Sequence, residues 1–305
     1  MKKIGSVPQS KKGKIRWSWH MMLLPGVLFT AVFAYLPMFG IVMSFQNFNP
    51  FKGFLRSEWV GLDNFEYLFR LPGFGTALRN TLFIAISKLI LGILVPLAVA
   101  LLLNEVKKRW FARTVQTAVF LPYFLSWVIL GGIVKEVFSG SGIINQVLGA
   151  FGLEPVMFLL DNTAFPWVLI GTDVWKGMGY NMVLFLAAIT GIDASLYEAA
   201  QIDGAGRWAQ CFYITIPGML PTIVLVCTLA LGGVLNAGFD QVFILYNPIV
   251  YESGDIIDTF VYRIGLIDRQ YSVAAAIGLF KSVVSTTLVG GSYFLAYRLC
   301  NYRIF

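Results

Sequence analysis

The sequence predicts an all-α integral membrane protein with six transmembrane helices, and three observations support that prediction. Of the 305 residues, 57% are hydrophobic and only 13% are charged, whereas a soluble domain carries about 25% charged residues. The apolar residues gather in long runs, not in the short alternating segments of a transmembrane β-barrel. Because lipid offers no hydrogen-bond partners, each run must pair its own backbone groups, as a helix does.

Six stretches reach the roughly 20 mostly apolar residues that a spanning helix needs. They are 21–44, 79–103, 115–138, 166–190, 217–246 and 272–298. The first could be a signal-peptide core, but its uncharged run exceeds the roughly 7 to 15 residues of such a core, and no small-residue cleavage site follows. We therefore predict a retained first span, a basic tail at 1–20 and one membrane domain at 21–305.

The connecting segments differ in composition. Residues 45–78 are rich in aromatics, as in "FNPFKG" and "LPGFG", which suits a segment at the membrane interface. Residues 139–165 and 247–271 are rich in Gly, Asn, Asp and Pro, which are typical of loops. No repeat or soluble domain is evident in the sequence, so the spans define the whole architecture.

The distribution of Lys and Arg predicts the orientation of the spans. With the N-terminus in the cytoplasm, the inner segments hold Lys2, Lys3, Lys11, Lys12, Lys14, Arg16, Lys107, Lys108, Arg109, Arg113, Arg207, Arg298 and Arg303. The outer segments hold only Lys52, Arg56, Arg70, Arg79, Arg263 and Arg269. Both termini and the segment 193–217 are therefore predicted to be cytoplasmic. The basic N-terminal cluster is interpreted as a topological signal rather than a nucleic-acid-binding site.

Cysteine and histidine are too sparse to predict a metal site. The three cysteines, Cys211, Cys227 and Cys300, are unevenly spaced, and His20 is the single histidine. Neither a disulfide framework nor a metal site is expected from this pattern.

Five charged residues lie more than three positions from either end of a predicted span, and a charge costs about 2.5–3.5 kcal/mol at the bilayer centre. Asp173 and Lys176 are three residues apart and could pair on one helix face, either as a structural pair or in a pathway. Snorkelling to the interface is the favoured interpretation for Lys88 and Lys281. Asp240 is the fifth.

Asp240 lies in a polar cluster with Asn236, Gln241 and Tyr246. The cluster lines either a polar path or a helix contact, and we favour the path. In the fourth span, Trp175, Tyr180 and Asn181 combine aromatic faces with an amide. Such groups suit a sugar, whose C–H faces stack on rings while its hydroxyls need hydrogen-bond partners; the alternative is that the two rings are core or interface residues.

The polar segment 193–217 shows the signals of a two-helix turn. Asp193 can cap a short helix that runs from Ala194 to about Ile202, and Asp203 can cap a second one. Gly204 can adopt the positive φ of a tight turn. Trp208, Phe212 and Ile216 recur every four residues as an apolar stripe, and Pro217 ends the segment. Composition alone would also fit a plain interfacial connector.

The spacing within this segment resembles the EAA signature of binding-protein-dependent ABC importer permeases. Glu198-Ala199-Ala200 is followed, after three residues, by Gly204 and, after nine more, by Ile214-Thr215-Ile216-Pro217. The family has Leu where this chain has Ile216. In that family the loop docks on a cytoplasmic ATPase. The resemblance therefore implies coupling roles for a set of residues: Glu198, Ala199, Ala200, Asp203, Gly204, Ala205, Trp208 and Pro217.

The resemblance extends over nearly the whole chain. "LPGVLFTAVFAYLPMFGIVMSF", "FLPYFLSWVILGGIV" and "NPIVYESGDIIDTFVYRIGL" are similar to permeases that import polysaccharides or complex oligosaccharides. It implies a type I ABC importer permease fold in a bacterial plasma membrane. It also implies a second, different permease chain, an ATPase dimer and an extracellular solute-binding lipoprotein.

No phosphate-binding loop of the Walker type is present in the sequence. The resemblance therefore implies that ATP and Mg²⁺ bind to the partner ATPase and that this chain carries no cofactor. The substrate-pathway candidates are Trp175, Tyr180, Asn181, Asn236, Asp240, Gln241 and Tyr246.

Two other functions remain as alternatives. An ion-coupled secondary sugar transporter would use Asp173, Asp240 and the lysines as coupling sites. A membrane-embedded enzyme would need a base, a nucleophile or a metal cluster, and the single histidine without convergent carboxylates disfavours it.

Overall fold

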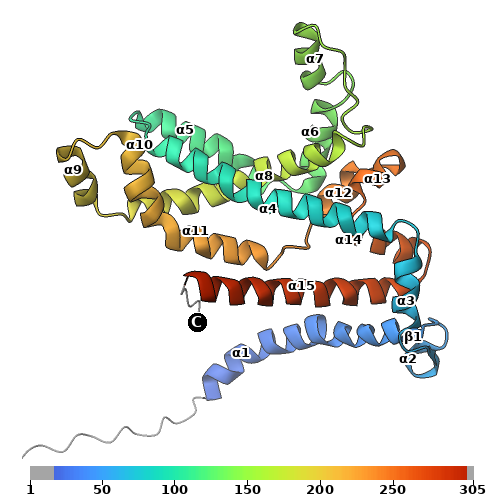
Figure 1. The fold of residues 1–305 in the computed structure, drawn as a ribbon. Helices are drawn as coiled ribbons and strands as arrows, with labels where there is room; N and C mark the ends of the chain where they lie inside the picture. Colours follow the sequence, from blue (N-terminus) through green and yellow to red (C-terminus); the bar gives the residue numbers. More distant parts are fainter. Residues whose placement is uncertain (1–16, 301–305) are drawn as a thin grey trace, which may run out of the picture.

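The structure is a computed structural model that describes residues 17–300, and it is helical almost throughout (Figure 1). The predicted basic tail lies outside the described residues up to position 16, as do Arg303 and its neighbours. Within the described range, two short strands, β1 (Gln46–Asn47) and β2 (Glu58–Trp59), pair antiparallel with Gln46 opposite Trp59. The prediction of an all-α membrane protein is confirmed.

Between four and six segments of the described chain can cross a membrane. Four helices are long and apolar enough on their own: Met21–Phe45, Phe74–Asn104, Arg207–Leu231 and Tyr271–Gly291. The count rises to six if each of two bent pairs forms one span, Arg109–Phe124 with Trp127–Val137 and Phe165–Thr190 with Ala194–Ile202. The chain is thus a multi-pass membrane protein.

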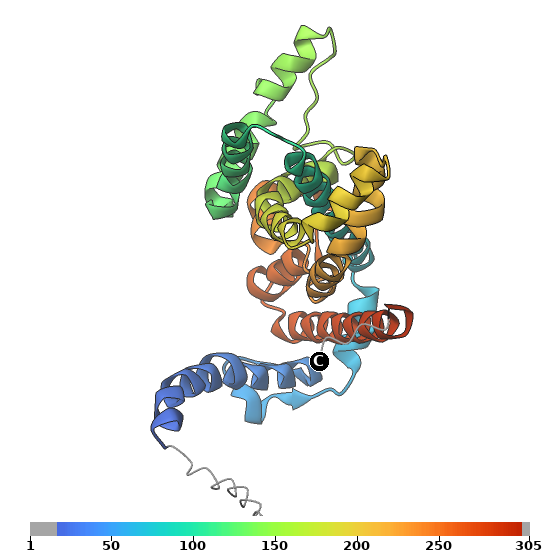
Figure 2. The same cartoon turned by 90° about the vertical axis from the view of Figure 1, so that its left-hand side faces the viewer.

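The first span lies at the edge of the molecule. It consists of α1 (Trp17–Thr30), η1 (Ala31–Tyr35) and η2 (Leu36–Phe45) and packs along α15 (Tyr271–Cys300). Beyond it come β1, α2 (Gly53–Arg56), β2 and α3 (Asp63–Arg70). Figure 2 shows this span and α15 on one side of the remaining helices.

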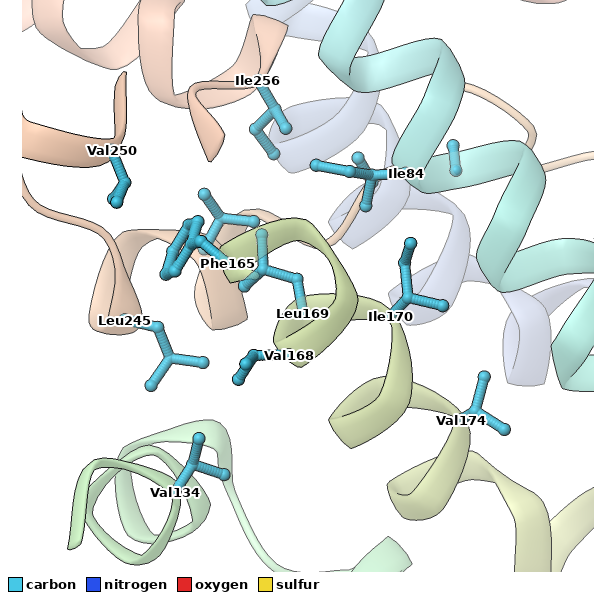
Figure 3. Packing of buried hydrophobic residues seen from close by; sticks show 13 residues of the cluster. Ile84, Val134, Phe165, Val168, Leu169, Ile170, Val174, Leu245, Val250 and Ile256 are labelled. Carbon is cyan, nitrogen blue, oxygen red and sulfur yellow. The ribbon is translucent and has the colours of Figure 1, made fainter. Parts of the chain in front are cut away.

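The centre of the fold is the pair α4 (Phe74–Asn104) and α8 (Phe165–Thr190), which pack along each other. Around the first half of each helix lies an apolar cluster in which Phe165 and Leu169 of α8 face Leu245, while Ile84 of α4 lies near Ile256 (Figure 3). A second cluster joins the other halves of α4 and α8 to α11. Within a membrane it is the close packing of such side chains that stabilises helix association, and this holds the two central helices in register.

The predicted third span is broken. α5 (Arg109–Phe120) and η3 (Leu121–Phe124) are bent by 110° from α6 (Trp127–Val137), and α7 (Ile143–Ala150) follows. Pro122 is the second residue of the short η3, and Leu125 and Ser126 are extended. Lys176 of α8 satisfies the carbonyls at the bend, since its Nζ donates to the oxygens of Tyr123 at 3.0 Å and Leu125 at 2.6 Å. The predicted pair of Lys176 with Asp173 is therefore wrong.

The predicted fifth span, 217–246, is wrong at both ends. Its helix begins ten residues earlier, because α10 (Arg207–Gln210), η4 (Cys211–Thr215) and α11 (Ile216–Leu231) are continuous. Pro217 follows the π-helical turn η4 within this continuous helix, so it does not end the loop. Residues 232–238 are not helical, and Gly238 has a φ of +90°.

After this break comes α12 (Phe239–Leu245), which packs on α6. The chain continues through η5 (Pro248–Val250), α13 (Tyr251–Gly254), α14 (Ile257–Tyr262) and η6 (Arg263–Ile267) into α15. Arg263 and the buried Asp255 form an ion pair at 2.5 Å in this region. Lys281 of α15 likewise pairs with Asp258 at 2.5 Å, so its interpretation as a snorkelling residue is wrong.

Candidate functional site

The first candidate site is α9 (Ala194–Ile202), which follows α8 after a bend of 67°. Figure 1 shows α9 projecting from the end of the bundle where α1 begins and α15 ends. The Asp193 carboxylate caps this helix by accepting a hydrogen bond from the Ser195 backbone N–H at 2.9 Å. The predicted helix, with its cap, is confirmed.

The turn after α9 depends on a glycine. The Ala205 N–H donates to the carbonyl of Ala200 at 2.8 Å, and Gly204 has a φ of +80°. This hydrogen bond closes the turn with a residue in the left-handed backbone conformation directly after the helix, and that conformation favours glycine. Asp203 is the C-cap of α9, while the next helix begins after Gly206 without a side-chain cap. The prediction that Asp203 caps a second helix is therefore wrong.

α9 is tied to the long helices behind it. The hydroxyls of Tyr197 and Thr215 lie 2.9 Å apart and join α9 to the start of the fifth span. Arg207 forms an ion pair at 3.2 Å with Glu105, at the end of α4. α9 is therefore bonded to η4 through Tyr197, and α10, which follows it, is paired with the end of α4.

The predicted coupling residues form a largely open surface on this segment. Exposed members are Glu198, Ala199, Asp203, Gly204, Trp208 and Pro217, while Ala200 and Ala205 are partly buried. Trp208 is 76% exposed, and its ring stacks on Phe212 at a centroid distance of 6.3 Å. A small-residue helix face beside exposed rings is suited to contact with another protein.

Replacing Asp193 by alanine is expected to fray the first turn of α9, because the N–H of Ser195 loses its acceptor. That hydrogen bond lowers the pKa of Asp193 below its ordinary value. The cap is therefore present at neutral pH and is lost only as the pH falls through this lowered pKa. Hydrogen exchange of residues 194–198 should be faster in Asp193→Ala and near normal in Asp193→Asn. Equal exchange in Asp193→Ala and the parent chain would contradict the capping role; Asp203→Ala is the control.

The second candidate site is a polar cavity between α4, α8 and the non-helical residues 232–238. Its volume is about 330 Å³, and Lys88, Asp173 and Asn236 line it together with Gly233 and Gly238. An adjoining cavity of about 160 Å³ shares Lys88 and Asp173 and reaches Asn181. Non-helical backbone at membrane depth occurs only where it is buried in protein or lines a water-filled cavity.

Lys88 connects the three walls of this cavity. Only 8% of the residue is exposed, and its Nζ donates to the Ala237 carbonyl at 2.7 Å and to Oε1 of Gln241. The same Nζ lies 3.6 Å from Oδ1 of Asp173, whose side chain is 36% exposed. Snorkelling is therefore the wrong interpretation of Lys88: the break at 232–238 frees the Ala237 carbonyl, which together with Gln241 and Asp173 holds its charge inside the protein.

The remaining pathway candidates occupy several environments. Trp175 lines an apolar groove of about 640 Å³ between α6 and α8. Tyr180 stacks on Tyr123, with ring centroids 5.2 Å apart. Asn181 donates to the Gly92 carbonyl at 3.0 Å, so it also joins α8 to α4.

Gln241 is fully buried, and its amide donates to the Leu169 carbonyl at 2.7 Å and to the Thr172 hydroxyl at 2.8 Å. Of the seven candidates, the polar cavities thus include Asn181 and Asn236. Lys88 and Asp173 were missing from that set. In the sequence, Lys88 and Asp173 stand out as charges in the middle of predicted spans. The sequence does not show which helix supplies the partner of each charge.

α12 presents an aromatic face with a carboxylate in it. Gln241, Val242 and Leu245 are buried, whereas Asp240 and Phe243 are exposed. Ring contacts of 4.9–6.1 Å join this face to neighbouring segments; they are Phe239–Phe243, Phe239–Tyr262, Phe243–Tyr262, Phe243–Tyr246 and Tyr246–Tyr251. An exposed carboxylate would be costly against lipid tails, so this face is suited to water or to another protein.

Comparison with known proteins decides the family. Residues 89–299 match the family described as "Binding-protein-dependent transport system inner membrane component". The chain belongs to this family. Among its relatives is "Protein LplB" of Bacillus subtilis (strain 168), 39% identical over 94% of this chain and 90% of that protein.

Another member of the family is the "Polygalacturonan/rhamnogalacturonan transport system permease protein YteP" of the same strain, 41% identical over 88% of this chain and 84% of that protein. The fold is similar to a chain in the crystal structure of a bacterial ABC transporter involved in the import of the acidic polysaccharide alginate. That chain is 37% identical, with a TM-score of 0.85 and coverage of 93% of this chain and 96% of that one. The predicted type I ABC importer permease fold is thus confirmed for this family member.

Proposed function

We propose that this chain is one transmembrane subunit of an ATP-driven importer for an oligosaccharide or polysaccharide fragment in a bacterial plasma membrane. The observation that carries the proposal is α9, an exposed and capped helix that is bonded to η4 and is followed by α10, which is ion-paired with the end of α4. Its family and the carbohydrate names of its relatives support the substrate class. α9 and both termini then face the cytoplasm.

In this proposal a cytoplasmic ATPase dimer binds at α9. Glu198 meets a polar or basic group of the ATPase, while Ala199 and Gly204 allow close approach. ATP and Mg²⁺ bind to that partner, so this chain needs neither a cofactor nor catalytic residues. A second, different permease chain completes the pathway, and an extracellular lipoprotein delivers the sugar; a related transporter has been crystallised with a pentasaccharide-bound periplasmic protein.

The sugar passes the aromatic face of α12 and the cavity at residues 232–238. Rings such as Phe243 and Tyr246 offer faces for sugar C–H groups, and Asp240 offers an acceptor beside them. Deeper in the protein, Asn236 and Asp173 line the polar cavity. The Asp173 carboxylate can accept hydroxyl hydrogens there, while Lys88 compensates its charge.

Replacing Glu198 by lysine is expected to weaken association with the ATPase at least about tenfold, because a charge reversal within one contact costs more than about 1.4 kcal/mol. Uptake of labelled oligosaccharide should fall with it. Gly204→Val should act similarly by straining the turn. The measurements are co-purification of the ATPase and uptake by cells that carry the complete transporter.

Glu154→Lys, in the exposed segment after α7, is the matched charge-reversal control and should leave both quantities unchanged. Normal association and uptake in both α9 variants would refute the coupling role. Uptake that persists without the ATPase and collapses with an uncoupler would instead favour the ion-coupled transporter, with Asp173 and Asp240 as its coupling sites.

A further inference from the structure

The segment 49–56, between the first span and β2, presents two apolar side chains fully to its surroundings. Phe51 and Leu55 are each 100% exposed, and Lys52 and Arg56 are exposed beside them. The two apolar residues are four positions apart, as are the two cations. We call this segment the apolar-basic tip.

The tip is held by a dense set of hydrogen bonds. The Asn49 side chain accepts from the Phe51 N–H at 2.9 Å, and the Asn49 carbonyl accepts from the N–H groups of Lys52 and Gly53, both at 3.0 Å. The Ser57 hydroxyl accepts from the Asn49 N–H at 3.0 Å and donates to the Gly53 carbonyl at 2.7 Å. The exposure of Phe51 and Leu55 is thus a consequence of an ordered turn.

The inner side of the tip is anchored to the ends of two spans. Phe48 and Phe54 pack with ring centroids 5.1 Å apart, and the Phe48 N–H donates to the hydroxyl of Ser272 in α15 at 2.8 Å. The Gln46 side chain, directly after η2, donates to the Phe54 carbonyl at 2.9 Å. The tip is therefore fixed where the first span ends and α15 begins, opposite α9.

The tip lies beside the end of the first span, which is exposed along most of its length. The most apolar part of the first span has none of its residues buried, as expected of a helix that contacts lipid. Figures 1 and 2 show α2 beside the end of η2, on the side of α15 away from α4 and α8. The exposed first span thus leads through β1 into the segment that carries the exposed Phe51 and Leu55.

We propose that the apolar-basic tip inserts into the membrane interface at the end of the bundle opposite α9. Phe51 and Leu55 enter the boundary between headgroups and acyl chains, and Lys52 and Arg56 bind the phosphates of anionic lipids. Apolar side chains beside cations match the two layers of such an interface. Continuity with the lipid-facing first span distinguishes lipid from a protein partner docked over the centre of the bundle.

Depth measurements with a nitroxide label test the proposal. The full chain, with its three cysteines replaced by serine, would carry Phe51→Cys or Leu55→Cys and be placed in nanodiscs that contain anionic lipid. Labels at both positions should collide several-fold more with oxygen, which enters the bilayer, than with a water-soluble nickel chelate. Glu58→Cys, on the exposed β2 of the same hairpin, is the control and should show the reverse. A label at 51 that nickel reaches freely, or that neither reagent reaches, would overturn the insertion.

The role of the two cations is tested separately. In nanodiscs of zwitterionic lipid alone, the ratio of oxygen to nickel collisions at position 55 should fall relative to discs with anionic lipid. Lys52→Gln with Arg56→Gln should remove that difference between the two lipids. If Lys52 and Arg56 are both present and the ratio of oxygen to nickel collisions is still equal in the two lipids, phosphate binding would be refuted. Neither result depends on the ATPase or on the sugar, so failure here is distinguishable from failure of the proposed transport function.

Discussion

Replacing Lys88 by methionine is expected to destabilise the fold by about 3 kcal/mol, as is typical when one partner of a buried ion pair is removed. The Lys88 ammonium joins α4 to the Ala237 carbonyl, to Gln241 and to Asp173. Methionine fills a similar volume but leaves these acceptors without a donor inside the protein. The expected result is a loss of the arrangement around residues 232–238.

Denaturant unfolding in mild detergent measures this effect, and a double-mutant cycle assigns it. Asp173→Asn should recover part of the loss caused by Lys88→Met, because an uncompensated carboxylate is then removed. Recovery should be incomplete, since Gln241 and Ala237 still lack their donor. Lys107→Met replaces an exposed lysine and should be nearly neutral. A Lys88→Met chain as stable as the parent chain would contradict the role of Lys88 as the connecting charge.

Replacing Gly179 by alanine is expected to destabilise the fold by about 2 kcal/mol through overpacking. A Cβ at this position would lie 2.5 Å from Cα of Phe120 and 2.7 Å from the carbonyl oxygen of Val119. Both are backbone atoms of α5, so a change of rotamer cannot relieve the contact and α5 must move away from α8.

Gly177, two residues earlier on α8, provides the matched control. A Cβ there would meet nothing within 4 Å, so Gly177→Ala should be neutral or slightly stabilising because alanine favours the helix. Unfolding of the two variants under identical conditions measures the difference. Equal stability of Gly179→Ala and Gly177→Ala would show that α5 and α8 do not rely on this close approach.

Local signals predicted several elements closely. The predicted spans 79–103, 166–190 and 272–298 correspond to Phe74–Asn104, Phe165–Thr190 and Tyr271–Cys300. The helix Ala194–Ile202 was predicted from the cap at Asp193 and the turn at Gly204. Apolar length, a cap and a left-handed glycine all act within a few residues of chain, which is why the sequence reveals them.

The two broken spans show where such signals end. The stretches 115–138 and 217–246 are mostly apolar, and apolar length does not distinguish a straight helix from a bent one. The bend beside Pro122 persists because Lys176 comes from another helix to satisfy the freed carbonyls. The break at 232–238 is stabilised in the same way by Lys88.

The sequence by itself determined a helical multi-pass membrane protein, its membrane-transport family signature and the helix proposed to meet an ATPase. Only the tertiary structure decided which charges meet: Lys88 with Asp173, Lys176 with the carbonyls before α6, and Lys281 with Asp258. The physical reason is that a charge at membrane depth must find a partner, and the nearest acceptor in space lies on a helix that is distant in sequence.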